Sequence, residues 1–389
     1  MTGLMDDITI GAAFARAVAT YADRPFLAVP TNPARPYLQQ GLTLTFAQAA
    51  TQVDALKARY TRAGYGHGSR VATLMENHPA FVLHKLALNS LGACCVPINP
   101  DYRAGETAYL MEHSRPDLVL AVAWRRGQIE EALAQSSYKP PLVVIEDVEA
   151  DLPDARRPLL TEPISPATPA SILYTSGTTG RPKGCVLSNG YEMSCGGWYA
   201  NLDGIAALRP GEDRIYNPLP LYHINAGVLS LLGVMVAGLC QIMPDRFHPH
   251  RWWTEIIETE ASVAHYLGVI AAMLNVQPPS PLDRAHKLRF ALGAGIAGLA
   301  GCALSQVGNV GPDLGQGYIV DSFMVVVLGG VGQLAGTVYA ALGLGIVNKL
   351  LEGVAGAVLA KIMVLVLIVV FIQKRPQGLF ALKGRSAEA

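Results

Sequence analysis

The sequence has no excess of charge of either sign. Its 389 residues contain 30 basic and 30 acidic side chains, so the formal net charge is zero. A basic surface is the usual electrostatic requirement for binding nucleic acid or anionic lipid. The charge balance therefore argues against a general attraction to either, and we predict no nucleic-acid partner.

The sequence also lacks a C-x-x-C motif and a secretory signal. The six cysteines form no C-x-x-C pair and have no zinc-ligand spacing with histidine, so we predict no metal site and scattered thiols in a reducing compartment. The N-terminal stretch MTGLMDDITIGAAF has two early acidic residues and no basic segment before an apolar core, which is not the pattern of a secretory signal. We therefore expect residues 1–290 to lie in the cytoplasm.

Charged side chains become scarce after residue 290. Residues 1–290 carry 50 of them, whereas residues 291–372 carry only Asp313, Asp321, Lys349, Glu352 and Lys361. Soluble domains have about 25% charged residues. The change falls inside the stretch RAHKLRFALGAGIAGLAGCALSQ, and it predicts two domains, residues 1–290 and residues 291–389.

The first domain alternates helical and strand-like runs, which is typical of an α/β protein. Helical periodicity predicts helices over Thr45–Gly64 and Asn77–Leu91. Short apolar runs predict four strands, over Arg70–Met75, Cys94–Ile98, Asp117–Ala123 and Leu142–Glu146. Residues 150–169 are proline-rich and polar, and are predicted to be a surface connection.

One uncharged run of 23 residues, Leu221–Met243, has the length of a membrane span. His223 and Asn225 near its start favour another interpretation, a buried helix followed by a strand. A membrane span remains the alternative.

The stretch Ser171–Gly184, SILYTSGTTGRPKG, joins an apolar strand to a loop of small hydroxyls and glycines that ends near a lysine. Glycines let the backbone approach a ligand, and exposed N–H groups with hydroxyls form a cradle for an anion. Lys183 adds a point charge, so the loop predicts phosphate binding. It is not a Walker A loop, because Gly184 follows the lysine. A flexible surface loop is the alternative.

The order TSGTTGRPKG resembles the phosphate-binding signature of the AMP-forming adenylating superfamily, which includes acyl-CoA synthetases. Asn77–Leu120 is similar to the N-terminal subdomain of that family. NPLPLYHINAG (Asn217–Gly227) is similar to its proline–histidine motif, in a form like that of carnitine- or crotonobetaine-type CoA ligases. The resemblance covers residues 1 to about 290, and implies the first part of an adenylating-enzyme large domain, with mixed sheets and flanking helices.

The resemblance also implies roles for individual residues. The ATP phosphates are expected to contact Thr175, Ser176, Gly177, Thr178, Thr179, Gly180 and Lys183. His223 is expected to line the acyl pocket, with a purely structural, partly buried histidine as the alternative. Gly293 and Gly295 fall in the glycine turn beside the nucleotide. The implied cofactors are ATP, magnesium and CoA, and the implied substrate is a carboxylic acid.

The sequence departs from the family pattern in two places. Ser188-Asn189 stands where the family often has Ser-His. Residues 291–389 contain no Thr-Glu pair, no Thr-Gly-Asp and no segment resembling the mobile lid, and these motifs hold magnesium, ribose and acyl-adenylate in the family. We therefore predict a truncated ligase with little or no adenylating activity.

The last hundred residues contain apolar runs of membrane length. Val354–Ile372 has 19 residues with one lysine, close to the ~20 needed to span a bilayer. The stretch QKRPQGLFALKGR that follows it has lysines and arginines but no acid, which predicts a cytoplasmic C-terminus. Ala291–Val307 and Phe323–Val347 are rich in glycine and alanine, which allows close helix contacts in lipid. A Gly/Ala-rich core of a soluble domain is the alternative.

This region resembles the permease subunits of branched-chain amino-acid and urea ABC transporters. The likeness rests on ALGAGIAGLAG, on the run GNVGPDLGQGYIVDSFMVVVLGGVGQLAGTVYAALGLGIVNKLLE and on the ending KRPQGLF. It implies an all-α transmembrane segment in the inner membrane. Gly329–Gly345 corresponds to the cytoplasmic loop that docks on the ABC ATPase subunit. Phe290–Gly295 fits both families, so the two resemblances meet there.

Taken together, the sequence predicts an AMP-forming acyl-CoA synthetase homologue fused to a permease tail. Such an enzyme converts a carboxylate to an acyl-adenylate and then to a CoA thioester. Two alternatives remain: an inner-membrane permease subunit of an ABC transporter, and a non-functional fusion product.

Overall fold

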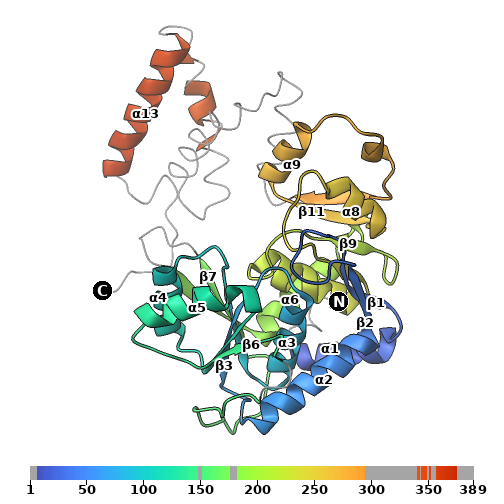
Figure 1. Ribbon diagram of the computed structural model, residues 1–389. Coiled ribbons are helices and arrows are strands. Elements are labelled where there is room, and N and C mark those ends of the chain that lie inside the picture. The colour runs from blue at the N-terminus through green and yellow to red at the C-terminus, as the bar shows by residue number, and fades with distance from the viewer. Residues whose placement is uncertain are drawn as a thin grey trace. The chain divides into compact units, whose positions relative to one another are not determined.

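The computed structural model describes residues 7–147, 151–175, 182–293, 340–341, 343–347, 350–351 and 356–374. The chain divides into two compact units, Met1–Gly298 and Leu299–Ala389, which we call the N-terminal and the C-terminal unit. Most of the described residues belong to the N-terminal unit, which contains two β-sheets with helices packed against them (Figure 1).

The first sheet has six strands in the order β6-β5-β3-β4-β7-β8. All neighbours are parallel except β7 and β8, which form an antiparallel hairpin. The strands are β3 (Arg70–Leu74), β4 (Cys94–Ile98), β5 (Leu118–Ala121), β6 (Leu142–Val144), β7 (Pro169–Thr175) and β8 (Lys183–Ser188). The carboxyl ends of β3 to β7 therefore lie at one edge, where open α/β sheets bind ligands.

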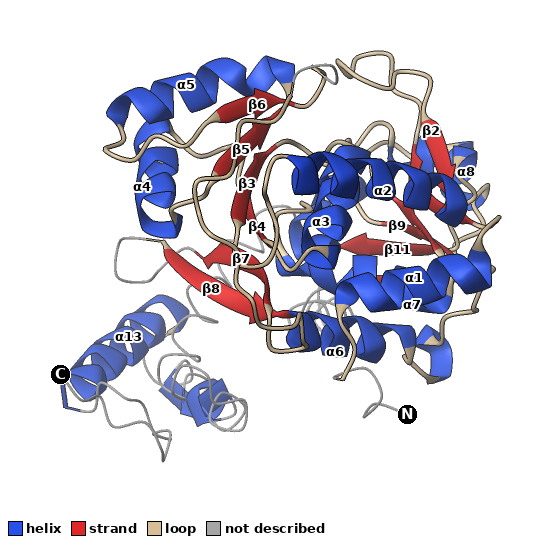
Figure 2. Cartoon of the chain, turned by 90° about the horizontal axis from the view of Figure 1, so that it is seen from below, coloured by secondary structure: helices blue, strands red, loops and turns tan. Residues whose placement is uncertain are grey.

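Helices cover both faces of this sheet, with α2 and α3 on one face and α4 and α5 on the other (Figure 2). The helices are α2 (Phe46–Arg62), α3 (Pro79–Ser90), α4 (Ala104–Ser114) and α5 (Arg126–Gln135). Alternate strand residues face opposite sides, so Val71 joins one hydrophobic core while Ala72 and Leu74 join another. Because β3 is buried on both faces, its apolar run is nearly continuous.

The second sheet has the order β12-β11-β9-β10-β1-β2, parallel except for the pair β1 and β2. Its strands are β1 (Pro25–Val29), β2 (Leu42–Thr45), β9 (Arg214–Tyr216), β10 (Cys240–Ile242), β11 (Val263–Tyr266) and β12 (Phe290–Gly293). The remaining helices of the unit are α1 (Ile10–Tyr21), α6 (Asn189–Ala200), α7 (Leu231–Ala237), α8 (Trp252–Glu258) and α9 (Gly268–Asn275). Short helical turns are η2 (Ala123–Arg125), η3 (Gly204–Ala206), η4 (Asn225–Ser230) and η5 (Pro281–Arg284).

The helices and strands predicted from periodicity are confirmed, because their ends carry clear local signals. Thr45 caps α2 in a capping box, in which its hydroxyl accepts from the Gln48 N–H and the Gln48 side chain accepts from the Thr45 N–H. Pro79 opens α3, at a position where its missing N–H costs no hydrogen bond. The four predicted strands are β3, β4, β5 and β6, within two residues of the expected ends.

The uncharged run Leu221–Met243 is a buried helix followed by a strand, as predicted, and the alternative of a membrane span is wrong. It forms the π-helical turn η4, then α7 and β10. Leu231, Leu232 and Val234 are fully buried in the main core of the unit. The run lacks charge because it is enclosed by protein.

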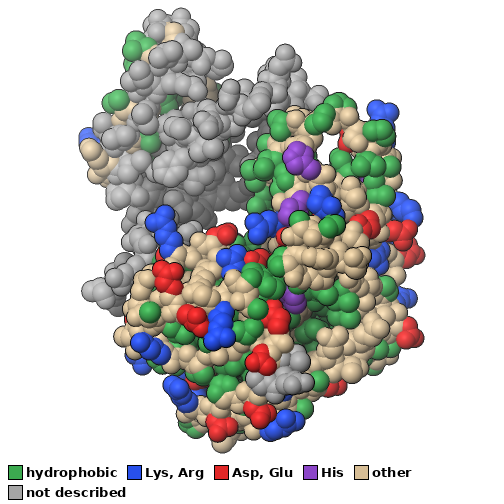
Figure 3. All heavy atoms as spheres, viewed as in Figure 1, with side chains coloured by type: hydrophobic (Ala, Val, Ile, Leu, Met, Phe, Trp, Pro, Cys, Tyr) green, Lys and Arg blue, Asp and Glu red, His purple; other side chains and the backbone are tan. Residues whose placement is uncertain are grey.

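The basic stretch that precedes β12 is tied to the second sheet by ion pairs. Arg289 Nη1 lies 2.6 Å from Asp213 Oδ2, and Lys287 Nζ lies 2.6 Å from Glu260 Oε1. On the face shown in Figure 3, basic and acidic side chains are interspersed over the described surface of the N-terminal unit. Side chains of opposite charge are thus close together on this unit.

In the C-terminal unit, the principal described element is the helix α13 (Ala357–Lys374). A small core of Ala340, Leu344, Val364 and Ile368 packs within this unit. Across the described ranges, no helix has the length and apolar character needed to cross a membrane, so the span predicted over Val354–Ile372 is not found.

The other predicted membrane features fall largely or wholly outside the described residues. They are Ala291–Val307, Phe323–Val347 and the loop Gly329–Gly345 that was predicted to dock on an ATPase.

Candidate functional site

The phosphate-binding loop predicted from the sequence connects β7 to β8. These strands form a hairpin in which Thr175 is the cross-strand partner of Lys183. Both residues are exposed, at the carboxyl end of β7 and the start of β8. Paired residues of antiparallel strands have Cα atoms about 4.5–5.5 Å apart, so a hydroxyl and an ammonium group flank the mouth of the loop. Ser176, Gly177, Thr178, Thr179 and Gly180 lie outside the described residues.

Helix α4 supports this hairpin from one face of the sheet. The hydroxyl of Tyr174 and Nδ1 of His113 are hydrogen-bonded at 2.7 Å, and the Tyr109 hydroxyl donates to the Pro182 carbonyl at 3.3 Å. Burial raises the pKa of Tyr174 to about 12, so its hydroxyl stays protonated at neutral pH. The two tyrosines hold both ends of the loop to the same helix.

A buried ion pair supports the hairpin from the opposite face. Lys85 of α3 donates to Ser171 Oγ of β7 at 2.6 Å and to Glu192 Oε2 of α6 at 2.8 Å. The side chains of Lys85 and Glu192 are at most 2% exposed. Since α6 begins directly after β8, this triad connects α3 to both the strand before the loop and the helix after it.

His223, the predicted acyl-pocket residue, is exposed rather than partly buried, and its role in the acyl pocket stays a prediction. It lies in the turn before η4, and this turn is fixed by Asn77. The Asn77 side chain accepts from the Leu221 N–H at 2.8 Å and donates to the Leu219 carbonyl at 3.0 Å. Because Asn77 follows β3, it holds the histidine segment against the carboxyl edge of the first sheet.

The turn that carries His223 also depends on a close backbone contact at Gly227. A Cβ atom at this position would lie 1.9 Å from the Leu221 carbonyl oxygen. We expect Gly227→Ala to lower the free energy of unfolding by about 1–3 kcal/mol, the usual cost of overpacking, because backbone must move. Urea unfolding followed by tryptophan fluorescence measures this change.

Gly127→Ala is the matched control for this prediction. Gly127 lies in α5, where an added Cβ meets nothing within 4 Å. The substitution is expected to leave stability unchanged or to raise it by up to about 1 kcal/mol through helix propensity. Equal effects of the two substitutions would contradict the contact at Gly227.

Gly293 occupies the last position of β12, opposite Tyr266 of β11. A Cβ at Gly293 would lie 2.5 Å from the Tyr266 ring, so the glycine allows the ring to lie over the strand. Strands β9, β11 and β12 are parallel, and Asn217 follows β9. Gly293 is therefore at the same edge of the second sheet from which the His223 segment leaves. Gly295 lies outside the described residues.

Ser188 and Asn189, where the sequence departs from the family pattern, both have structural contacts. Ser188 caps α6 by accepting from the Tyr191 N–H at 3.2 Å. Asn189 is fully buried, accepts from the Ile10 N–H at 3.0 Å and donates to the Thr168 carbonyl at 2.9 Å. Asn189 thus joins α1 to the base of the hairpin through one accepted and one donated hydrogen bond.

The cofactors implied by the sequence differ in how well these residues fit them. The Thr175 hydroxyl and the Lys183 ammonium group suit the phosphates of ATP, which accept hydrogen bonds and carry negative charge. Within the described ranges, no three His, Cys, Asp or Glu side chains are grouped to hold a metal ion. The described residues therefore fit the nucleotide phosphates, and magnesium stays an expectation from the family resemblance.

Some residues that build this site gave no recognisable signal in the sequence. Lys85 is a lysine within an apolar helix, and Glu192 lies 107 positions further along the chain. Asn77 contacts residues 142 and 144 positions away. The one sequence signal is that apolar residues lie on every side of α3. A helix of this kind is usually buried, so its polar residues need buried partners.

Comparison with known proteins agrees with this architecture. The family model described as AMP-binding enzyme matches residues 14–318. A second model, described as branched-chain amino acid transport system / permease component, matches residues 281–372. The two matches overlap over residues 281–318, which include Phe290–Gly295, the stretch that resembles both families.

Individual relatives support the larger match. The medium/long-chain-fatty-acid–CoA ligase FadD6 of Mycobacterium tuberculosis is 30% identical over 76% of this chain and 49% of its own length. Crotonobetaine/carnitine–CoA ligase of Shigella dysenteriae is 27% identical over 58% of this chain and 45% of its own. The chain thus spans about half the length of these curated relatives.

A solved structure has the same fold. The N-terminal domain of FACL13 from Mycobacterium tuberculosis superposes with a TM-score of 0.62 at 21% identity, covering 74% of this chain and 70% of that one. The α/β arrangement of two sheets with flanking helices is therefore that of an adenylating enzyme. With a family match over most of its residues, the chain belongs to the AMP-binding enzymes.

Proposed function

We propose that the N-terminal unit binds the phosphates of ATP at the β7–β8 hairpin, as part of a site that activates a carboxylate as its acyl-adenylate for transfer to CoA. The observation that carries the proposal is the pairing of Thr175 with Lys183 at the carboxyl edge of the sheet. In such a reaction the protein mainly positions the reactants and stabilises charge on phosphate oxygens. Lys183 provides positive charge, and the Thr175 hydroxyl provides a hydrogen bond. The cytoplasm, where ATP and CoA are present, is the proposed compartment.

The exposed His223 side chain is the proposed acyl-pocket residue. It lies on the segment that Asn77 holds beside the ends of β3 and β4, and β7 is the neighbour of β4. The proposed acyl pocket and the proposed phosphate site are therefore at the same sheet edge. The relatives act on fatty acids or on crotonobetaine and carnitine according to their names, so a carboxylate with an apolar or small polar body is the proposed substrate class.

Magnesium and CoA are proposed from the family alone. Magnesium, when bound with ATP, supplies charge neutralisation to the phosphates. Residues 291–389 contain neither a Thr-Glu pair nor Thr-Gly-Asp. In the family, these two motifs supply the side chains that hold the metal and the ribose. We therefore propose that it binds ATP but adenylates a carboxylate weakly or not at all by itself.

Titration calorimetry and pyrophosphate exchange test this proposal together. Lys183→Met is expected to weaken ATP binding by about 10–100-fold, since a hydrogen bond to a charged group contributes about 1.5–3 kcal/mol. Lys139→Met, at another exposed lysine, is the control and is expected to bind ATP as the unchanged chain does. Exchange over a panel of carboxylates is expected to stay at background.

Two results would count against the proposal. Equal ATP affinity of the Lys183→Met and Lys139→Met variants would remove the hairpin from the nucleotide site. Strong carboxylate-dependent exchange would show that the chain is a complete ligase, with divergent residues in place of the absent motifs.

A membrane transport subunit is the second candidate, and it is favoured by the permease match over residues 281–372. A subunit of this kind is an inner-membrane protein with a cytoplasmic C-terminus that binds an ABC ATPase. This candidate predicts retention in the membrane fraction after a carbonate wash and co-purification of an ATPase. Release by the wash would contradict it. If ATP binding, exchange and membrane retention are all absent, the non-functional fusion product is left.

A further inference from the structure

A groove of about 350 Å³ lies between the C-terminal end of α8 and the turn that precedes β2. Glu258 and Thr259 line it on the helix side, and residues 40–42 line it on the side of the turn. This volume is at the lower end of the range for small-molecule sites. The described residues of its wall include neither the phosphate-binding hairpin nor the His223 segment, so the groove is a separate place in the fold.

The pairing of strands in the second sheet directs Arg214, Ala28 and Thr43 to the same face. Ala28 of β1 is paired with Thr43 of β2 and with Ile242 of β10. Ile242 is in turn paired with Tyr216 of β9, and Arg214 is two residues before Tyr216. Paired residues share a face of the sheet, and so do residues two apart in a strand. The three side chains therefore line the groove together.

The guanidinium group of Arg214 is held by the end of α8 but is not neutralised. Its Nε donates to the Thr259 carbonyl at 2.6 Å, which fixes the orientation of the planar group. Asp213 and Glu260, the neighbouring carboxylates, form ion pairs with other basic side chains at 2.6 Å. Within the part of the chain that the structure describes, Nη1 and Nη2 of Arg214 have no partner. Their N–H groups match the two oxygens of a carboxylate.

The Glu258 carboxylate provides a fixed negative charge on the same wall. Its Oε1 accepts from the Thr31 N–H and its Oε2 accepts from the Thr31 hydroxyl, both at 2.8 Å. A carboxylate has about four acceptor positions, so positions remain for a further donor. An ammonium group supplies such donors together with the opposite charge, whereas a second anion would be repelled here.

The turn side of the groove suits a polar ligand. The Gln40 amide and the Thr43 hydroxyl line the groove at exposed positions, and neither forms a hydrogen bond within the described ranges. Ala28, paired with Thr43, is small and leaves room above the strand. The groove therefore combines one positive charge, one negative charge and neutral hydrogen-bonding groups.

We propose that this groove binds a small polar α-amino acid, with its carboxylate on the Nη groups of Arg214, its ammonium group on Glu258 and its side chain along β2. Thr259 and Thr31 hold the two charged groups in place before a ligand arrives, so little side-chain freedom is lost on binding. Because the groove contains none of the residues proposed to bind ATP, the amino acid is a ligand and not the carboxylate that is activated.

Titration calorimetry of the full chain with L-glutamine tests the proposal, and two analogues each lack one charge. N-acetyl-L-glutamine lacks the ammonium group, and L-glutamine amide lacks the carboxylate. Each analogue is expected to bind at least 10-fold more weakly than L-glutamine, because each loses hydrogen bonds to a charged group.

Substitutions of the two charged side chains are expected to have complementary effects. Arg214→Gln is expected to weaken L-glutamine binding at least 10-fold without weakening the binding of the amide. Glu258→Gln is expected to weaken L-glutamine binding at least 10-fold without weakening the binding of the N-acetyl compound. Arg209→Gln and Glu212→Gln, at exposed positions outside the groove, are the matched controls and are expected to bind as the unchanged chain does.

Two further variants locate the ligand in the fold. Thr43→Trp fills the groove from an exposed position of β2 and is expected to abolish L-glutamine binding without changing the urea unfolding midpoint. His223→Ala is expected to leave L-glutamine binding unchanged. Loss of binding in His223→Ala with retention in Arg214→Gln and Thr43→Trp would place the ligand in the acyl pocket and overturn the proposal.

Other results would also contradict an amino-acid site in this groove. They are the absence of L-glutamine binding to the unchanged chain, and equal binding of L-glutamine and its two analogues. An equal loss for all three compounds in Arg214→Gln would indicate a structural defect in place of a contact with the carboxylate. None of these results depends on whether the chain binds ATP or exchanges pyrophosphate.

Discussion

Replacing Lys85 with methionine is expected to lower the free energy of unfolding of the N-terminal unit by about 3–5 kcal/mol. Lys85 and Glu192 form a buried ion pair at 2.8 Å, with both side chains nearly inaccessible to solvent. Removing one partner leaves the other charge buried without compensation, which costs about this much in proteins. Since native domains are stable by only about 5–15 kcal/mol, this single change removes a large fraction of the total.

The pair already contains an unmet hydrogen-bonding group. Oε1 of Glu192 has no partner among the described residues, while Oε2 accepts from Lys85. Loss of Lys85 removes the donor to Oε2 of Glu192 and to the Ser171 hydroxyl, and neither oxygen of Glu192 then has a partner among the described residues. The expected damage is therefore at the base of β7, beside the phosphate-binding loop.

Urea unfolding followed by tryptophan fluorescence measures the effect, because all four tryptophans, Trp124, Trp198, Trp252 and Trp253, belong to the N-terminal unit. The control is Lys57→Met, which removes an exposed ion pair with Asp54 and is expected to cost at most about 0.5 kcal/mol.

A second variant distinguishes the buried charge from a simple packing defect. The double variant Lys85→Met with Glu192→Leu removes both charges and is expected to be more stable than Lys85→Met alone. If Lys85→Met costs no more than Lys57→Met, or if the double variant is the least stable, the buried pair does not have the proposed importance.

The local structure of this chain is largely predictable from its sequence, because local signals determine it. Thr45 and Gln48 are three residues apart and form a capping box at the start of α2. Strands β3 to β6 follow from short apolar runs separated by helices. The pattern of the phosphate-binding loop also lies in consecutive residues, from Thr175 to Lys183.

The order of the strands and the supports of the site are less accessible, because they depend on contacts between distant residues. Nothing in the runs around β3 and β9 indicates that they belong to different sheets. His84 and Lys85 are consecutive polar residues of α3, and both are buried because the helix is enclosed by its neighbours. Their partners, Tyr60 and Glu192, lie 24 and 107 positions away.

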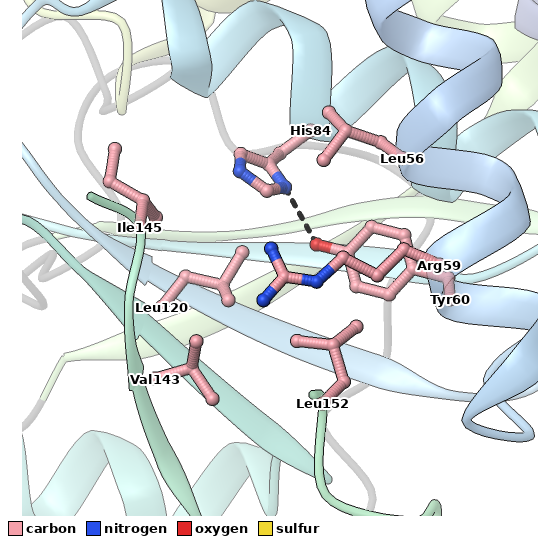
Figure 4. A pocket seen from close by; sticks show the side chains of 8 residues that line it. All are labelled: Leu56, Arg59, Tyr60, His84, Leu120, Val143, Ile145 and Leu152. Carbon is pink, nitrogen blue, oxygen red and sulfur yellow. Dashed lines mark hydrogen bonds between the residues drawn. The ribbon is translucent and has the colours of Figure 1, made fainter. Parts of the chain in front are cut away.

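Acidification from pH 7 to pH 5 is expected to lower the free energy of unfolding of the N-terminal unit by about 4 kcal/mol through two buried histidines. Burial lowers the pKa of His265 to about 4, and burial together with Arg59 lowers the pKa of His84 to about 3. Each histidine is hydrogen-bonded to a tyrosine hydroxyl. Nδ1 of His84 lies 2.7 Å from the Tyr60 hydroxyl (Figure 4), and Nε2 of His265 lies 2.6 Å from the Tyr199 hydroxyl.

The direction of the effect depends on which state, folded or unfolded, binds a proton more readily at the two histidines. In the unfolded chain both imidazoles take up a proton near their ordinary pKa of about 6.5, whereas the folded chain keeps them neutral to lower pH. Below pH 6.5 the unfolded state binds more protons, so stability falls as the pH falls; above pH 6.5 these groups have no effect. At about 1.36 kcal/mol per pH unit, each histidine contributes a loss of about 2 kcal/mol at pH 5.

Glutamine variants isolate these two contributions from those of other titrating groups. Glutamine accepts a hydrogen bond from tyrosine but does not titrate, so His84→Gln and His265→Gln are each expected to reduce the pH-dependent loss by about 2 kcal/mol. His250→Gln, at an exposed histidine, is expected to change it little. Urea unfolding at pH 7 and pH 5 measures the difference. If both buried-site variants lose as much stability on acidification as the unchanged chain does, the two histidines are not held neutral in the core.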